Sequence, residues 1–149
     1  MNHMKKFTYC LILTFCCACH STTGEFDLCS GKLHPYYYPE LTYTGDFYTI
    51  KKHYYTNYKE VDAPNNNGIV KIRFHVNCKG ETGNYKVESY GFDYTTTEIN
   101  PNITEQLIQL TKSLTEWIPA QNEDGDNVNS HKFFAFKIKN GQLIDILPK

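Results

Sequence analysis

The histidines and acidic residues of this chain do not follow the spacing of a catalytic or metal-binding motif. His34, His53, His75 and His131 are widely separated, and none has a second ligand at the spacing of a zinc site. The acidic run 123–126 places its glycine too early for a calcium loop and lacks the closing glutamate. The motifs of serine hydrolases, zinc proteases and phosphate-binding loops are missing from the sequence. We therefore interpret the histidines as surface residues and expect no catalysis, no metal and no cofactor.

The amino terminus has the three parts of a secretory signal. Lys5 and Lys6 form a positively charged start, residues 7–15 are mostly apolar, and a short run of small residues and cysteines follows. The apolar run is too short to span a bilayer, which takes about 20 residues. We predict that residues 1–18 are a signal peptide and that the protein is exported. A buried core helix is the alternative interpretation of the same run.

The exit of this signal carries a cysteine, Cys19, directly after the small residue Ala18. This arrangement resembles a bacterial lipoprotein box, in which the cysteine is acylated and becomes the new amino terminus. The resemblance implies lipid on Cys19 and an anchor in the cell envelope that faces the periplasm, with the outer membrane as the expected site. Plain secretion is the alternative.

Cys29 and Cys78 remain once the signal and the anchor are accounted for. Of the six cysteines, three would leave with the signal and one would carry lipid. Two cysteines left over in an oxidising compartment normally pair, and these two lack the spacing of a redox or zinc motif. We predict a Cys29–Cys78 disulfide, which would add about 4 kcal/mol on the chain-entropy model.

The composition argues against a nucleic-acid partner and leaves the many tyrosines open to two interpretations. The net charge is -1, the only arginine is Arg73, and the lysines are scattered, so no basic surface for phosphates is predicted. Twelve tyrosines stand against nine phenylalanines. Tyrosine suits binding surfaces that are half-buried, but it also favours strands, so the excess has a purely structural explanation as well.

The segment that follows the signal is predicted to be an extended arm. Residues 19–44 contain the run Tyr36-Tyr37-Tyr38 and show no helical period. Residues 45–149 are expected to form one folded domain. Asp46 is the expected cap of a first helix. Four residues spaced by three, four and four form one face of that helix: Phe47, Ile50, Tyr54 and Tyr58.

Two strands and a second helix are predicted next. Residues 69–76 alternate apolar and polar side chains, which is typical of a half-buried strand, and a second strand follows a short turn. Asn100 and Pro101 are typical of the cap and first turn of a helix. An apolar helical face continues from there to Trp117, and Pro119 ends it.

The carboxyl end predicts a hairpin. Residues 132–139 form an apolar-rich strand, Asn140-Gly141 is a strong signal for a two-residue turn, and residues 142–147 would return. The order strand, strand, helix, strand predicts an α+β fold: a small antiparallel sheet packed against one main helix, with the upstream helix and the hairpin strand in addition. The predicted core consists of Ile72, Phe74, Val76, Val87, Leu107, Leu110, Leu114, Trp117, Phe134, Phe136 and Ile138.

A glycine, Gly68, leads into the first strand of this domain, and Gly80 lies in the turn after it. The run Trp117–Ala120 closes the predicted helix, and a further strand follows Gly125. In this order the motifs of residues 68–141 resemble the TonB C-terminal domain family. The resemblance implies a periplasmic domain that binds envelope proteins, outer-membrane transporters among them, and that adds a partner's extended segment to a sheet edge.

We therefore expect a non-catalytic envelope lipoprotein with a TonB C-terminal-like protein-binding domain. One alternative is a component of TonB-type energy transduction across the outer membrane, and another is a small secreted hydrolase with an unrecognised site. Tyr54, Tyr55 and Tyr58 are the candidate binding surface, unless they pack the first helix onto the sheet. If the hairpin at 140–141 forms, its returning strand covers the edge that a transporter peptide would need.

Overall fold

The computed structural model describes residues 25–148, so the predicted signal peptide and Cys19 lie outside the described residues. Two helices and a five-stranded sheet account for half of this range, which confirms the predicted α+β fold. None of the helices within residues 25–148 is long and apolar enough to span a bilayer.

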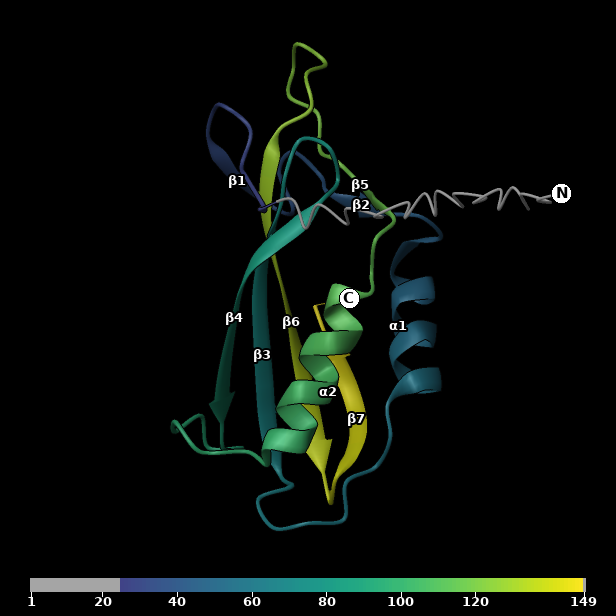
Figure 1. The fold of residues 1–149 in the computed structure, drawn as a ribbon, viewed down its shortest axis with the longest axis vertical. Helices are drawn as coiled ribbons and strands as arrows, with labels where there is room; N and C mark the ends of the chain where they lie inside the picture. The colour runs from purple at the N-terminus through teal and green to yellow at the C-terminus, as the bar shows by residue number, and fades with distance from the viewer. Residues whose placement is uncertain (1–24, 149) are drawn as a thin grey trace, which may run out of the picture.

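Three long strands make up most of the sheet (Figure 1). β3 (Gly68–Val76) lies between β4 (Thr82–Tyr90) and β6 (Asn129–Lys139) and is antiparallel to both. Two short strands share the outer edge of β6. β1 (Leu33–Pro35) is parallel to its first residues, and β7 (Gln142–Leu147) is antiparallel to its last. The predicted hairpin therefore forms.

The alternation seen in the sequence decides which face of the sheet is buried. In β3 the buried apolar side chains are Val70, Ile72, Phe74 and Val76. The residues between them, which include Lys71 and Arg73, lie on the opposite face. Because successive side chains of a strand point to opposite faces, this one pattern separates a core face from a face without helix cover.

The second helix, α2 (Pro101–Lys112), begins as predicted and ends earlier than predicted. The Asn100 Oδ1 atom accepts a hydrogen bond from the Asn102 N–H at 3.0 Å, as a cap does. The prediction that the helix continues to Trp117 is wrong, because Trp117 belongs to a short strand, β5 (Trp117–Ile118). Beyond Lys112 the chain leaves the helix, and the Trp117 ring packs against the core aromatics instead.

The first helix, α1 (Asp46–Asn57), covers the expected range. Its cap is Gly45, which has a φ of 75°, and Asp46 is the first helical residue, so the predicted role of Asp46 is wrong. The Thr49 hydroxyl donates to the Gly45 carbonyl at 2.8 Å. A left-handed φ favours glycine, which explains why Gly45 suits the position directly before the helix.

The described part of the predicted arm belongs to the folded domain. Besides β1, it contains β2 (Thr42–Tyr43), which pairs with β5, and its Leu41 and Tyr43 side chains are buried. These contacts are made with residues more than 70 positions away, so no local pattern in the sequence marks them.

Both helices lie on the same face of the sheet (Figure 1). α2 contacts β3 and β4, and Tyr54 of α1 packs against Phe134 and Phe136 of β6. Most of the predicted core is buried between these layers, whereas Val87 and Leu110 are only partly buried. Buried residues that the sequence analysis left out of its core include Tyr54, Ile103 and Ile146.

Candidate binding surfaces

The face of the sheet opposite the helices carries an apolar groove with lysines. Within residues 25–148 no helix lies over this surface, which we call the open face. Tyr90, Phe133 and Leu147 contribute from three strands, and the loop after β4 adds Phe92 and Tyr94. The groove has a volume of about 860 Å³. Tyr94 is 78% exposed, Leu147 48% and Phe92 45%, so all three present apolar surface at the groove.

The lysines of the open face lie beside its aromatic rings. The Lys71 ammonium is 4.9 Å from the centroid of the Phe133 ring, and that of Lys137 is 5.6 Å from the Phe92 ring. Both distances fall within the range of cation–π attraction. The groove can therefore offer apolar contact and positive charge at the same place.

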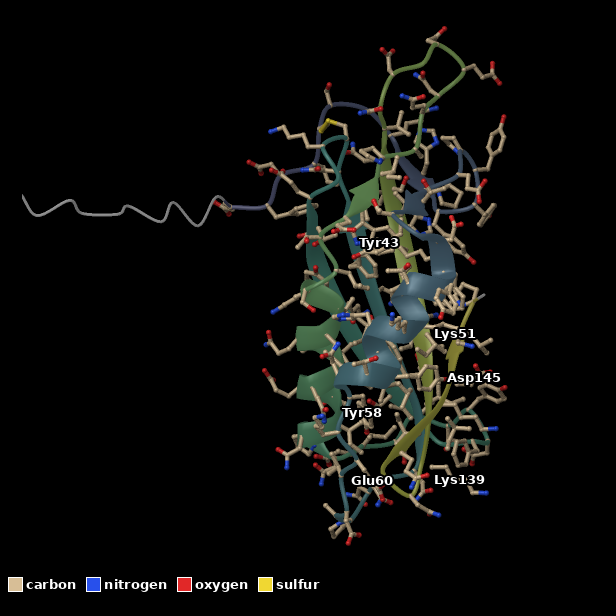
Figure 2. All side chains as sticks on the ribbon, turned by 90° about the vertical axis from the view of Figure 1, so that its right-hand side faces the viewer. Tyr43, Lys51, Tyr58, Glu60, Lys139 and Asp145 are labelled. Atoms are coloured by element: carbon tan, nitrogen blue, oxygen red, sulfur yellow. A yellow bond between two sulfur atoms is a disulfide. The ribbon has the colours of Figure 1, made fainter. Side chains whose placement is uncertain are left out.

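Positive charge predominates on the open face. Arg73 forms an ion pair with Glu88 at 2.7 Å, and Lys86 approaches the same carboxylate at 3.4 Å. The other acidic group at the groove, Asp145, lies 3.7 Å from Lys51 of α1 (Figure 2). Within residues 25–148, no carboxylate pairs with three lysines of the groove: Lys71, Lys137 and Lys139.

The three tyrosines predicted as a binding surface attach α1 to the rest of the domain. Tyr54 is fully buried, and its hydroxyl lies 2.9 Å from the Thr111 Oγ1 atom, so its assignment to a binding surface is wrong. The Tyr58 hydroxyl donates to the Gly141 carbonyl at 2.8 Å, and that of Tyr55 to the Ile144 carbonyl at 3.2 Å. Tyr55, at 45% exposed, is the only one of the three with a large exposed surface. The packing interpretation holds for Tyr54 and Tyr58.

Burial changes the acidity of these side chains. Loss of hydration raises the pKa of Tyr54 far above its usual value, although the bond to Thr111 acts in the opposite direction. Burial, followed by the negative charge of Glu60, raises the pKa of Tyr58 to about 12. Both phenols are therefore neutral hydrogen-bonding groups at any physiological pH.

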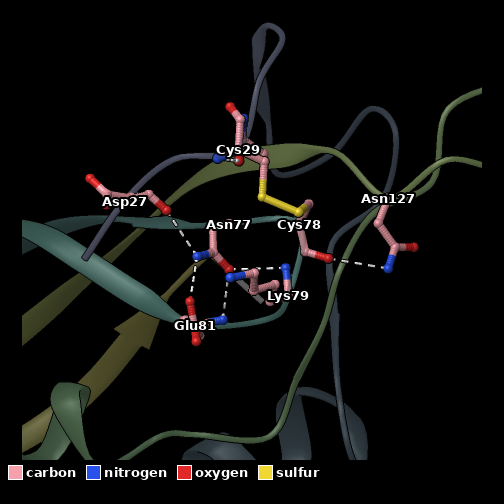
Figure 3. Close-up of a disulfide and its surroundings, with 8 residues drawn as sticks. Asp27, Cys29, Asn77, Cys78, Lys79, Glu81 and Asn127 are labelled. Atoms are coloured by element: carbon pink, nitrogen blue, oxygen red, sulfur yellow. Dashed lines mark hydrogen bonds between the residues drawn. A yellow bond between two sulfur atoms is a disulfide. The ribbon is translucent and has the colours of Figure 1, made fainter. Parts of the chain in front are cut away.

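Cys29 and Cys78 form a disulfide, with their Cα atoms 6.0 Å apart (Figure 3). Two asparagines fasten the same segment to the sheet. The Asn77 side chain donates to the Asp27 carbonyl at 3.0 Å. The Asn129 side chain bonds both the N–H and the carbonyl of Cys29, at 3.0 and 2.8 Å. The start of the described chain is thus fixed to the β3–β4 turn and to the first residue of β6.

The tip of the β6–β7 hairpin is held by the linker that precedes β3. The Gly141 N–H donates to the Asn66 carbonyl at 2.9 Å, and the Val61 N–H donates to the Gly141 carbonyl at 3.2 Å. β7 pairs with Ala135–Lys139 and therefore covers the end of the outer β6 edge, as the sequence predicts for a hairpin.

Within the described residues no histidine lines the groove, although His75 and His131 lie on the open face through the alternation of β3 and β6. The acidic run 123–126 also lies outside the groove. None of the four histidines named above is fully buried, and His131 is exposed. Burial lowers the pKa of His75, and the nearby His131 adds to this effect. Within residues 25–148 no group of three histidine, cysteine or acidic side chains is placed to hold a metal ion. In the run 123–126 the Asn122 side chain accepts from the N–H groups of Asp124 and Asp126, which makes it an ordinary turn.

Comparisons of this chain with protein-family models, with characterised proteins and with solved structures find no match.

Proposed function

We propose that this protein is a non-catalytic binding domain of the bacterial cell envelope, exported and held to a membrane by lipid on Cys19. In this proposal its open face docks an acidic segment of another envelope protein. The observation that carries it is the groove of exposed aromatic side chains with three lysines that lack a carboxylate partner within residues 25–148.

The chemistry of the groove favours a protein partner. An exposed apolar patch rimmed by charge is typical of interaction sites, and aromatic residues are enriched where proteins bind one another. Tyr90, Phe133 and Leu147 lie on paired strands, so this part of the groove is formed before a partner docks. Tyr94 and Phe92 would provide most of the apolar contact, because they are the most exposed aromatics of the groove.

The charge distribution favours an acidic partner. The chain has a net charge of -1, yet Lys71, Lys137 and Lys139 gather on one face. Such an asymmetry steers and orients an oppositely charged partner, and the effect weakens as salt rises. The resemblance to the TonB C-terminal domain family supports an envelope protein, with an outer-membrane transporter as one candidate.

Site-specific photo-crosslinking in cells tests the open face. A photoreactive phenylalanine analogue replaces Tyr94 in the full-length protein, and the matched control carries it at Tyr48 of α1, which is 76% exposed. We expect a discrete crosslinked envelope protein from position 94 and none from position 48. The crosslink should disappear when Lys71 and Lys137 are both replaced by glutamate. Equal patterns from the two positions would rule out the open face as the docking site.

Mass spectrometry of the membrane-extracted protein tests the anchor. We expect a mature chain that begins with an acylated Cys19, and a Cys19→Ser variant that is no longer retained in the membrane fraction. An unmodified mature chain with a different first residue would refute lipidation. The docking proposal would be unaffected, because the crosslinking experiment tests it separately.

A further inference from the structure

The outer edge of β6 is interrupted between β1 and β7. β1 pairs with residues 129–131 and β7 with residues 135–139, so residues 132–134 face no strand on this edge. A cleft of about 610 Å³ lies at the interruption, between the start of α1 and the segment 36–43. The cleft is separate from the open face, and Lys132 lines it.

Lys132 points to the helix-covered side of the sheet, in the alternation that also buries Phe134 and Phe136. Its ammonium lies 3.9 Å from the centroid of the Tyr36 ring and 5.6 Å from that of Phe134. Within residues 25–148 it forms no ion pair. Burial lowers its pKa to about 8, although the charge of Glu40 acts in the opposite direction. A partly buried cation without a counter-ion is unfavourable, and an anion would relieve it.

Trp117 also lines the cleft, but its indole N–H is covered and donates to no group of the described chain. A covered N–H is not accessible to a ligand in the cleft. The Lys132 ammonium is therefore the donor to which a ligand with acceptor oxygens would bind.

The remaining walls indicate the shape and charge of such a ligand. Tyr36, Tyr37 and Phe47 present aromatic surface, whereas Leu41, Tyr43 and Ile50 are buried. Glu40 and Asp46 are exposed at the cleft and would repel a second negative charge. The volume falls within the range of small-molecule sites, which is about 300–1,000 Å³. Three unpaired residues span only about 10 Å, which is short for an added strand.

We propose that this cleft binds a small organic monocarboxylate with an apolar or aromatic body. The carboxylate pairs with the Lys132 ammonium, and the body packs against Tyr36, Tyr37 and Phe47. Binding supplies the counter-ion that Lys132 lacks within residues 25–148. This site is independent of the open face, so its failure would leave the proposed function intact.

Trp117 is the only tryptophan of the chain, so its fluorescence reports on the cleft. The mature protein is titrated with 3-phenylpropionate, with the neutral 3-phenylpropionamide and with the dianion phenylsuccinate. We expect a saturable change with 3-phenylpropionate at millimolar concentration or below. Binding of the amide and of the dianion should be at least about tenfold weaker. A missing response to 3-phenylpropionate, or equal binding of the amide, would overturn the proposal.

Two variants separate the role of Lys132 from general charge. Lys132→Met keeps most of the apolar stem and removes the ammonium, and Lys79→Met, at an exposed lysine of the β3–β4 turn, is the control. We expect at least about tenfold weaker binding of 3-phenylpropionate by Lys132→Met and unchanged binding by Lys79→Met. Thermal unfolding verifies that both variants fold. As a second readout, NMR of the methylated lysines should show the Lys132 pKa rising on ligand addition. An affinity of Lys132→Met equal to that of the unmodified chain, or an unmoved pKa, would refute the site.

Discussion

At the scale of single residues, Tyr54 is the side chain of α1 that packs most closely against the sheet aromatics. Its ring lies 4.8 Å from that of Phe136 and 5.8 Å from that of Phe134. The Thr111 hydroxyl donates to the Leu107 carbonyl at 2.7 Å, so it accepts from the Tyr54 hydroxyl. Helical spacing placed Tyr54 on the correct face of α1, but spacing alone does not tell whether a tyrosine is fully covered.

Truncation of Tyr54 should therefore cost much more stability than loss of its hydroxyl. We expect Tyr54→Ala to lower the free energy of unfolding by about 3–5 kcal/mol, because a large cavity remains. Tyr54→Phe should cost about 1 kcal/mol, the value of one hydrogen bond. Urea unfolding measures both, with the exposed Tyr48→Phe as a control that changes little. A loss below 1 kcal/mol in Tyr54→Ala would contradict the packing described here.

The raised pKa of Tyr58 predicts that the folded domain loses stability at alkaline pH. Because the folded state holds the proton more tightly than the unfolded state, Tyr58 contributes stability that is complete below its unfolded pKa of 10.0. That contribution is lost as the pH rises through the folded value of about 12. We expect the melting temperature to fall as the pH rises from 10.0 to about 12. The decrease should be less steep in Tyr58→Phe, which has no phenol proton to lose. Parallel curves for the two proteins would show that Tyr58 is not responsible.

At the scale of elements, the β6–β7 hairpin depends on its turn. Asn140 and Gly141 have φ angles of 50° and 73°, the left-handed pair that the sequence signal predicts. A Cβ atom on Gly141 would also collide with the Val61 carbonyl. The turn therefore constrains the hairpin and the linker before β3 at the same time.

Alanine at Gly141 should destabilise the hairpin through both effects. We expect Gly141→Ala to lower the free energy of unfolding by about 2 kcal/mol or more. Gly125→Ala is the matched control, since its φ is 84° and no atom lies within 4 Å of the added Cβ, so only about 1 kcal/mol of backbone strain is expected. Chemical denaturation compares the two. Equal losses of unfolding free energy in the two variants would mean that the collision with the Val61 carbonyl does not destabilise Gly141→Ala.

The elements also show how far the sequence could predict the structure. The long strands and the start of α2 were predicted because alternation, a capping asparagine and a hairpin turn are local signals. β1, β2 and β5 were missed because two or three residues carry no period, and their pairing comes from distant segments. The open face was missed for a related reason: Phe133, Lys137 and Tyr90 converge only through strand register. The cleft at Lys132 likewise depends on an unpaired stretch of edge.

At the scale of the whole molecule, the disulfide joins the beginning of the described chain to the turn that follows the central strand β3. Cys29 and Cys78 are separated by 49 positions, and that interval includes β1, β2, α1 and β3. The pairing was predicted by elimination among six cysteines, and the structure brings the two sulfur atoms together. The asparagine contacts at Asn77 and Asn129 were not predictable, because they bind backbone groups of a distant segment.

Removal of the disulfide should lower the stability of the whole domain. We expect the double variant Cys29→Ser, Cys78→Ser to lose about 4 kcal/mol, the chain-entropy value for a loop of this length. Reduction of the unmodified protein should have a similar effect on its thermal unfolding. Labelling of two reactive thiols in the native, oxidised protein would contradict the bond itself.

The position of this crosslink also sets how the protein would respond to mechanical tension. If the chain is pulled from the side of its amino terminus, force that reaches Cys29 passes through the disulfide directly to Cys78. The backbone between the two cysteines, which includes α1 and all of β3, is then shielded from extension. Under tension, only the residues after Cys78 would unfold and extend. The residues between Cys29 and Cys78 would extend only after a reducing agent had cleaved the disulfide.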